Sequence, residues 1–163
     1  MANDKKTLVA YFSASGETER LARTIAQATG GDLHEIEPAV RYTAADLDWN
    51  DKRSRSSIEM NDPSSRPAVA SRVGNMDAYD IVFVGFPIWW YVAPTIVSTF
   101  LEAYDFAGKT VIPFATSGGS GMGRTEDVLK ACCAPETRWL PGKRLASRAS
   151  EAEVRAWVES LGL

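Results

Sequence analysis

Histidine and cysteine are scarce in this chain of 163 residues, which contains one histidine and two cysteines. Cys132 and Cys133 are adjacent, so they supply neither a spaced disulfide framework nor the paired ligands of a zinc site. We therefore expect no metal site, a reducing cytoplasmic setting, and a packing role for both thiols.

His34 lies in an expected strand, where we interpret it as structural. The glycine-rich turn around Ser120 lacks the G-x-S-x-G pattern of a hydrolase because Met122 occupies its last position, and we assign no catalytic residue.

A strong positive charge and a long apolar run are also missing. The net charge is −3, and lysine and arginine are scattered along the chain, which argues against nucleic-acid binding. No run approaches the roughly 20 apolar residues that a membrane-spanning helix needs. The apolar run after Lys5 and Lys6 is too brief for a signal peptide and leads directly into a helical pattern. With 45% hydrophobic residues, the composition is typical of a globular protein, and we expect one domain over residues 1–163.

Strand-like and helix-like patterns alternate along the chain. Five strands are expected, over residues 7–12, 32–37, 81–86, 110–115 and somewhere within 137–146. Apolar residues at helical spacing follow the first, third, fourth and fifth of these runs, and Ser150 with Glu153 forms a capping-box pair before the last helix. This order predicts an α/β fold, a doubly wound parallel sheet with helices on both faces.

A polar segment at about 38–78 separates the second and third expected strands, and it is longer than the usual crossover. Pro67 and the apolar spacing that follows it predict a short helix near the end of this segment. We interpret its basic middle, from Lys52 to Arg55, as a solvated surface.

Ligands of such sheets bind at the carboxyl ends of the strands, where three loops are notable. The first, Ser13-Ala14-Ser15-Gly16-Glu17-Thr18, groups three hydroxyls around one glycine at a helix start. Free N–H groups and the helix dipole favour an anion there, although serine and threonine are also good helix caps. The loop has no lysine and lacks the dinucleotide and nucleoside-triphosphate patterns, so we interpret it as the anchor of a cofactor phosphate.

The other two loops suit a flat ring. "FPIWWYVAP" brings Trp89 and Trp90 to the end of the third expected strand, where aromatic side chains can cover a planar group by stacking. Such a cluster taken alone is more often part of a core. "TSGGSGMG" follows the fourth strand with many small residues, which permit close approach to the edge of a heterocycle or make a flexible connection.

Together the three loops resemble the flavodoxin family. The resemblance rests on Ser13–Thr18, which is similar to the family's [ST]-x-[ST]-G-x-T loop, and on "GFPIWWYVAPTIVSTFLEAYDF" and "PFATSGGSGMGR". It covers nearly the whole chain, and the segment at 38–78 looks like a feature of one subgroup. It implies a single doubly wound five-stranded sheet in the order 2-1-3-4-5, a three-layer α/β/α architecture and one noncovalently bound FMN.

The resemblance also implies which residues hold the cofactor. The phosphate residues would be Ser13, Ser15, Gly16, Glu17 through its backbone N–H, and Thr18; the ring would be lined by Pro87, Ile88, Trp89 and Trp90, and its other edge would meet Ser117, Gly118, Gly119, Ser120 and Gly121.

Two functions would share this site. The first is an electron-transfer flavoprotein that serves redox partner proteins, and the alternative is an FMN-dependent NAD(P)H:quinone-type oxidoreductase with a small-molecule acceptor. Carriers often use a strongly charged rim, whereas only Glu102 and Asp105 are acidic between Gly85 and Gly108. That stretch also lacks glycine and carries the bulky Tyr91, so we expect the peptide at Tyr91 to resist a flip to positive φ, which favours two-electron chemistry and the oxidoreductase alternative.

Overall fold

A computed structural model of the chain describes residues 5–90, 92–116 and 125–163. Within them the strands are β1 (Thr7–Tyr11), β2 (Asp32–Glu35), β3 (Ile81–Pro87), β4 (Thr110–Thr116), β5 (Arg138–Trp139) and β6 (Lys143–Arg144). All pairings between these strands are parallel. The order β2-β1-β3-β4-β5, with β6 also paired to β4, confirms the predicted doubly wound topology.

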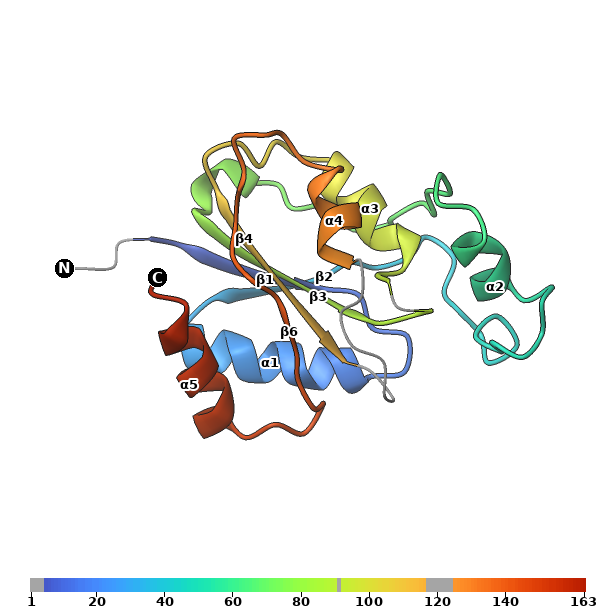
Figure 1. The fold of residues 1–163 in the computed structure, drawn as a ribbon, viewed down its shortest axis with the longest axis horizontal. Helices are drawn as coiled ribbons and strands as arrows, with labels where there is room; N and C mark the ends of the chain where they lie inside the picture. Colours follow the sequence, from blue (N-terminus) through green and yellow to red (C-terminus); the bar gives the residue numbers. More distant parts are fainter. Residues whose placement is uncertain (1–4, 91, 117–124) are drawn as a thin grey trace.

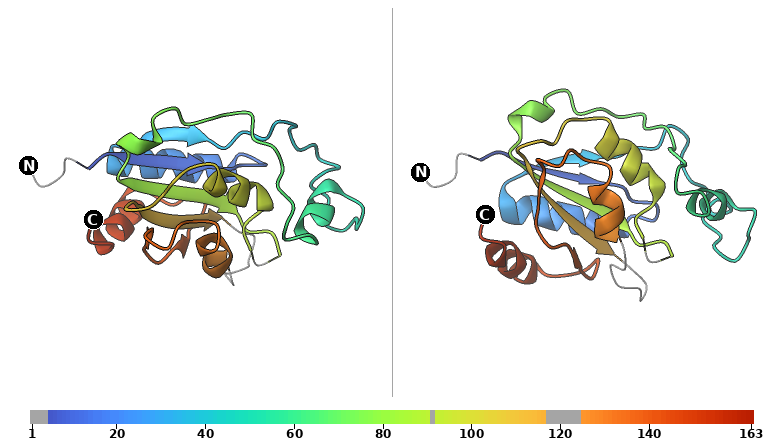
Figure 2. Two further views of the ribbon diagram at one scale, coloured as in Figure 1. Left: turned by 90° about the horizontal axis from the view of Figure 1, so that it is seen from above. Right: turned by 45° about the horizontal axis from the view of Figure 1, so that its top comes forward.

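Helices cover both faces of the sheet. They are α1 (Glu17–Thr29), α2 (Arg55–Met60), α3 (Thr95–Glu102), α4 (Thr125–Lys130), α5 (Glu151–Ser160) and the 3₁₀ turn η1 (Met76–Ala78). Figure 1 shows α1 and α5 on one face and α3 and α4 on the other, which gives the expected three layers. α2 lies apart, beyond the end of the sheet at which β1 and β3 finish (Figure 2).

Alternating side chains of the central strands build the two cores, as expected of strands buried on both faces. Val9 and Phe83 point toward α1 and α5, whereas Leu8 and Val82 point toward α3. Gly30 ends α1 in the left-handed conformation with φ 71°. At the start of α5 the Ser150 hydroxyl accepts the Glu153 N–H at 3.2 Å, which confirms the predicted cap.

Two strand predictions need correction. The alternation in the second expected strand predicts that both Leu33 and Ile36 lie in the core. Ile36, just beyond β2, is buried as predicted, but Leu33 is 37% exposed because β2 is the edge strand. The last strand was expected as one element, but it forms two pieces of two residues each. Pro141 lies between the pieces and has no N–H to donate, and the Gly142 N–H is bound by the Glu126 carboxylate at 2.6 Å.

The segment at 38–78 contains α2, which the sequence did not predict, and lacks the helix expected after Pro67. In its place Val69 forms an antiparallel bridge with Pro38, and the Ala70 N–H donates to the Glu37 carbonyl at 2.7 Å. This pairing satisfies backbone groups that a short, weakly favoured helix would have used. Arg66 fastens the segment to α3 through both oxygens of Glu102, at 2.7 and 3.1 Å.

His34 packs against Phe100, with ring centroids 6.1 Å apart. Its Nε2 is buried and has no hydrogen-bond partner among the described residues, and burial lowers the pKa of this imidazole. The unfolded chain therefore takes up the proton at higher pH than the folded chain does, so stability falls as the pH drops below about 6.5.

We expect the melting temperature of the protein without added ligands to decrease between about pH 7.5 and about pH 5.5, and His34→Gln to flatten this slope because glutamine stays neutral. Thermal unfolding of both proteins at several pH values measures the difference. An identical slope in the two proteins would show that another group is responsible.

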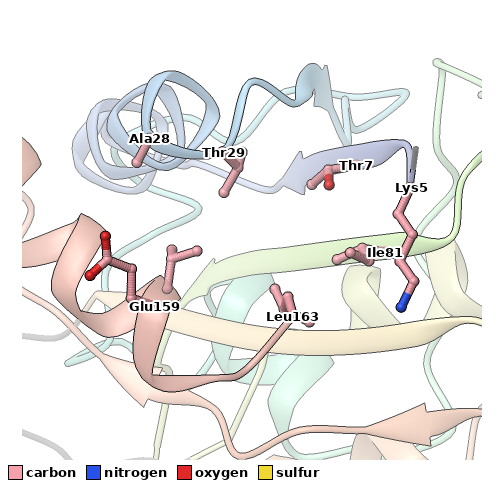
Figure 3. Close-up of a pocket in the computed structure, with 8 residues that line it drawn as sticks. Lys5, Thr7, Ala28, Thr29, Ile81, Glu159 and Leu163 are labelled. Carbon is pink, nitrogen blue, oxygen red and sulfur yellow. The ribbon is translucent and has the colours of Figure 1, made fainter. Parts of the chain in front are cut away.

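A cavity of about 390 Å³ lies at the amino ends of β1 and β3 (Figure 3). It is lined by Lys5, Thr7, Ala28, Thr29, Ile81, Val158, Glu159 and Leu163. The loops predicted to hold a cofactor follow the carboxyl ends of the strands, which is the end opposite this cavity. This cavity is therefore separate from the predicted site. Within the described parts of the chain, no helix combines the length and the apolar character needed to cross a membrane.

Candidate functional site

The loop between β1 and α1 forms an open turn at the end of the sheet. Gly16 is the N-cap of α1 and adopts φ 91°, a left-handed conformation that side chains disfavour. Among the described residues, an added Cβ on Gly16 would meet nothing within 4 Å, so this side of the backbone is open. Ser15, Gly16 and Glu17 are exposed, whereas Ser13 is half-buried and its Oγ accepts the Gly16 N–H at 3.0 Å.

The first turn of α1 presents backbone donors that have no partner among the described residues. The N-cap residue is Gly16, which has no side chain to accept an N–H of the helix, and the first ladder bond runs from the Arg20 N–H to the Gly16 carbonyl at 3.1 Å. The N–H groups of Glu17, Thr18 and Glu19 precede that bond, so they have no carbonyl partner in the helix. The Ser13 hydroxyl accepts the Gly16 N–H before the helix, and among the described residues no hydroxyl of this loop caps the N–H groups of the first turn itself. Donors at the positive end of a 13-residue helix fit a phosphate.

Thr18 is oriented differently from the other hydroxyl residues of this loop. Its side chain is 1% exposed, and its Oγ1 lies 2.7 Å from the Oγ1 of Thr116 at the end of β4. The hydroxyl thus connects the first loop to the strand that precedes the third loop. Because its hydroxyl is engaged with Thr116, Thr18 can contribute only its backbone N–H to a ligand in this turn.

The loop after β3 closes as a two-residue turn. The Trp89 N–H donates to the Val92 carbonyl at 2.9 Å, and the Val92 N–H donates to the Trp89 carbonyl at 3.1 Å. Trp90 in this turn has φ 49°, so one bulky residue of this loop adopts a left-handed backbone although the loop has no glycine. The two bonds between Trp89 and Val92 stabilise a conformation that a bulky residue seldom adopts. Tyr91 lies outside the described residues.

The side chains of the ring-lining stretch differ in exposure. Pro87 ends β3, and the buried Ile88 donates its N–H to the Thr116 carbonyl at 2.9 Å. Trp89 is half-buried, whereas Trp90 is 45% exposed. Among the described residues of this loop, Trp90 is thus the large aromatic side chain that is free to meet a ligand, and Trp89 is held by its neighbours.

Trp89 belongs to a cluster of three rings that the sequence did not predict. Phe12 directly after β1, Tyr42 in the 38–78 segment and Trp89 contact one another edge to face, and their centroids are 5.5 to 5.7 Å apart. Phe12 was expected only as a strand residue. Tyr42 shares the polar stretch with Trp49, which is 69% exposed, so no sequence signal distinguishes Tyr42 as the residue with a buried partner.

The third predicted group of site residues, Ser117, Gly118, Gly119, Ser120 and Gly121, lies outside the described residues. Thr116, the residue before them, is 4% exposed and bound to Thr18 and Ile88. The cysteines that follow α4 are half-buried against the core. Burial raises the pKa of both thiols, that of Cys133 to about 12, so they are protonated at neutral pH. The predicted packing role of the cysteines is confirmed.

The fold is matched among known proteins. Two chains described as flavoproteins, from Bacteroides eggerthii and Bacteroides uniformis, are each 52% identical, with TM-scores of 0.92 and 0.90. The alignments cover 98% and 96% of this chain and 99% of each of those chains. A flavoprotein from Lactobacillus acidophilus in complex with FMN is 23% identical over 94% of this chain and 99% of its own, with a TM-score of 0.69, so that likeness shows the fold alone.

Among curated proteins none matches the sequence. The family model described as flavodoxin matches residues 6–161. This range is nearly the whole chain and includes the predicted phosphate loop, the tryptophan loop and the third loop. The chain therefore belongs to the flavodoxin family.

Proposed function

We propose that this protein binds FMN and transfers electrons for redox partner proteins. The observation that carries the proposal is the uncapped amino end of α1, which opens beside the free space at Gly16. Membership of the flavodoxin family supports FMN, and so does the Lactobacillus neighbour, which was crystallised with it. The bound FMN would supply the redox chemistry.

The residues of this chain would bind and orient the cofactor. The N–H groups of the first turn of α1 and the hydroxyls of Ser13 and Ser15 would hold the phosphate. The Glu17 carboxylate carries the same charge sign as that phosphate, so only its backbone N–H would contribute. Trp90, with Pro87 and Ile88, would line the ring and exclude water from one side, and Ser117–Gly121 would meet its other edge.

One observation favours the alternative, an FMN-dependent oxidoreductase that uses NAD(P)H and a quinone-type acceptor. Of the two acidic residues between Gly85 and Gly108, Glu102 is paired with Arg66 at 2.7 Å, and Arg66 holds the pKa of this carboxyl below its usual range. The stretch that contains the tryptophan loop therefore has little unpaired negative charge with which to steer a basic partner protein.

Reduction of the FMN-loaded protein by NADPH separates the two functions. A carrier is expected to be reduced slowly by NADPH alone and rapidly once a catalytic amount of an NADPH-dependent flavoprotein reductase is added. Absorbance of the oxidised flavin under anaerobic conditions measures both rates. Rapid reduction without the reductase, followed by continuous NADPH oxidation when a quinone is supplied, would replace the carrier with the oxidoreductase.

At least one of the variants Trp89→Ala and Trp90→Ala is expected to lower flavin affinity by about 1 kcal/mol or more, because an aromatic stacking partner is lost. Trp89→Ala should also lower the melting temperature more than Trp90→Ala does, since Trp89 contacts two other rings and Trp90 is 45% exposed. Fluorescence titration of the flavin-free variants gives the affinities. Parental affinity in both variants would remove the tryptophans from the site.

A further inference from the structure

Tyr42 of the 38–78 segment contacts residues beside the proposed flavin site. Tyr42 contacts Phe12 with centroids 5.5 Å apart and Trp89 with centroids 5.6 Å apart, both edge to face. Phe12 follows β1, and Trp89 begins the turn that carries Trp90. The ring of Tyr42 therefore joins the ends of two strands that are separate in the sequence.

Tyr42 is also held in place by two residues of α2, Arg55 and Glu59. The Arg55 guanidinium lies 3.8 Å from the centre of the Tyr42 ring, and the Tyr42 hydroxyl donates to the Glu59 carboxylate. Burial, and next the hydrogen bond to Glu59, raises the pKa of Tyr42, so the phenol keeps its proton and remains a donor.

Arg55 and Glu59 are also fixed in place. They pair one helical turn apart on α2, with Nε and Oε2 3.0 Å apart, and their side chains are 22% and 15% exposed. A second Arg55 nitrogen donates to the Val40 carbonyl at 2.6 Å. A guanidinium with so little solvent exposure, already held by Glu59 and the Val40 carbonyl, loses few conformations when it stacks on a ring. The basic middle of the segment was expected to be a solvated surface. Arg55 within it instead packs against the Tyr42 ring and supports it.

We propose that Tyr42 is a positioning residue of the flavin site, which holds Trp89 and the turn after it in the arrangement that covers the flavin ring. This inference deepens the proposed function and rests on it. It assigns the 38–78 segment a role: α2 and its ion pair fix Tyr42, and Tyr42 fixes the ring-lining loop. Because Tyr42 acts on the ring side of the site, its loss should weaken riboflavin and FMN equally.

Titration of the flavin-free protein with FMN and with riboflavin tests the proposal. Tyr42→Leu removes two aromatic contacts and is expected to weaken binding of both flavins by at least about fivefold. Tyr42→Phe keeps the ring and should stay within about twofold of the parent for both. A loss confined to FMN, or parental affinity in Tyr42→Leu, would overturn the positioning role.

Tyr104→Leu is the matched control for instability. Tyr104 also packs against two aromatic rings, Phe100 and Phe106, lies beneath the Arg72 guanidinium at 5.1 Å, and accepts a backbone N–H, that of Val73, at 2.8 Å. It follows α3, away from the tryptophan loop. Tyr104→Leu should lower the melting temperature as Tyr42→Leu does, with parental flavin affinity. Equal losses of flavin affinity in both variants would show that destabilisation of the fold causes the loss, which would overturn the positioning role of Tyr42. If the parent protein binds neither flavin, the proposed function itself is wrong.

Discussion

Gly16→Val is expected to weaken FMN binding at least about tenfold more than riboflavin binding. Gly16 adopts φ 91°, and a β-branched side chain is strained in that conformation even though the space around it is open. The backbone should therefore shift, and the N–H groups at the start of α1 should lose their common direction. Only FMN presents a phosphate to these groups, so riboflavin binding should change little. Fluorescence titration with each flavin measures the two losses.

The other end of the same helix offers the control. Gly30 also has positive φ, 71°, and open space around an added Cβ, so Gly30→Val introduces a similar strain. It is expected to lower the melting temperature and to leave the ratio of FMN to riboflavin affinity at the parental value. Equal weakening of both flavins in Gly16→Val would mean that the turn does not hold the phosphate.

Gly85→Ala is expected to destabilise the fold by about 2 to 3 kcal/mol, which corresponds to a melting temperature lower by about 5 to 10 °C. Gly85 lies in the centre of β3, and an added Cβ would lie 2.1 and 2.2 Å from two ring atoms of Phe114 on β4. Phe114 is fully buried and packed, so its ring has no space into which it can move. Thermal unfolding measures the loss.

Two further variants identify the clash as the cause. Gly74→Ala adds the same methyl group where nothing lies within 4 Å and should keep the parental melting temperature within a few degrees. The double variant Gly85→Ala/Phe114→Leu should be more stable than the sum of the two single losses predicts, because leucine removes the atoms that the new methyl meets. Strict additivity would show that the ring of Phe114 is not the obstacle.

Much of the fold followed from patterns that depend on near neighbours in the sequence. The buried strands, the stop of α1 at Gly30 and the cap of α5 at Ser150 each rest on local spacing, and the structure has them where they were predicted. The errors lie where a distant partner decides. Leu33 is exposed because no strand covers β2 on its outer side, and the stretch after Pro67 pairs with residues 37–39 instead of coiling.

The candidate site divides in the same way. The hydroxyl-rich turn and the paired tryptophans stand out in the sequence because their residue types are unusual for a plain connection. The contact of Thr18 with Thr116 spans 98 residues, and that of Tyr42 with Trp89 depends on how the 38–78 segment folds back. The left-handed backbone of Trp90 is imposed by its two-residue turn, which residue preferences alone would not favour.

Titration of the flavin-free protein with FMN, followed by flavin fluorescence, tests the central claim most directly. We predict saturation at one FMN per chain, with tight binding that denaturation reverses, because the contacts proposed here are noncovalent. Inorganic phosphate should compete weakly with FMN, since it reaches only the helix end of the site. Fluorescence that rises in proportion to added FMN, as it does in buffer alone, would contradict the account.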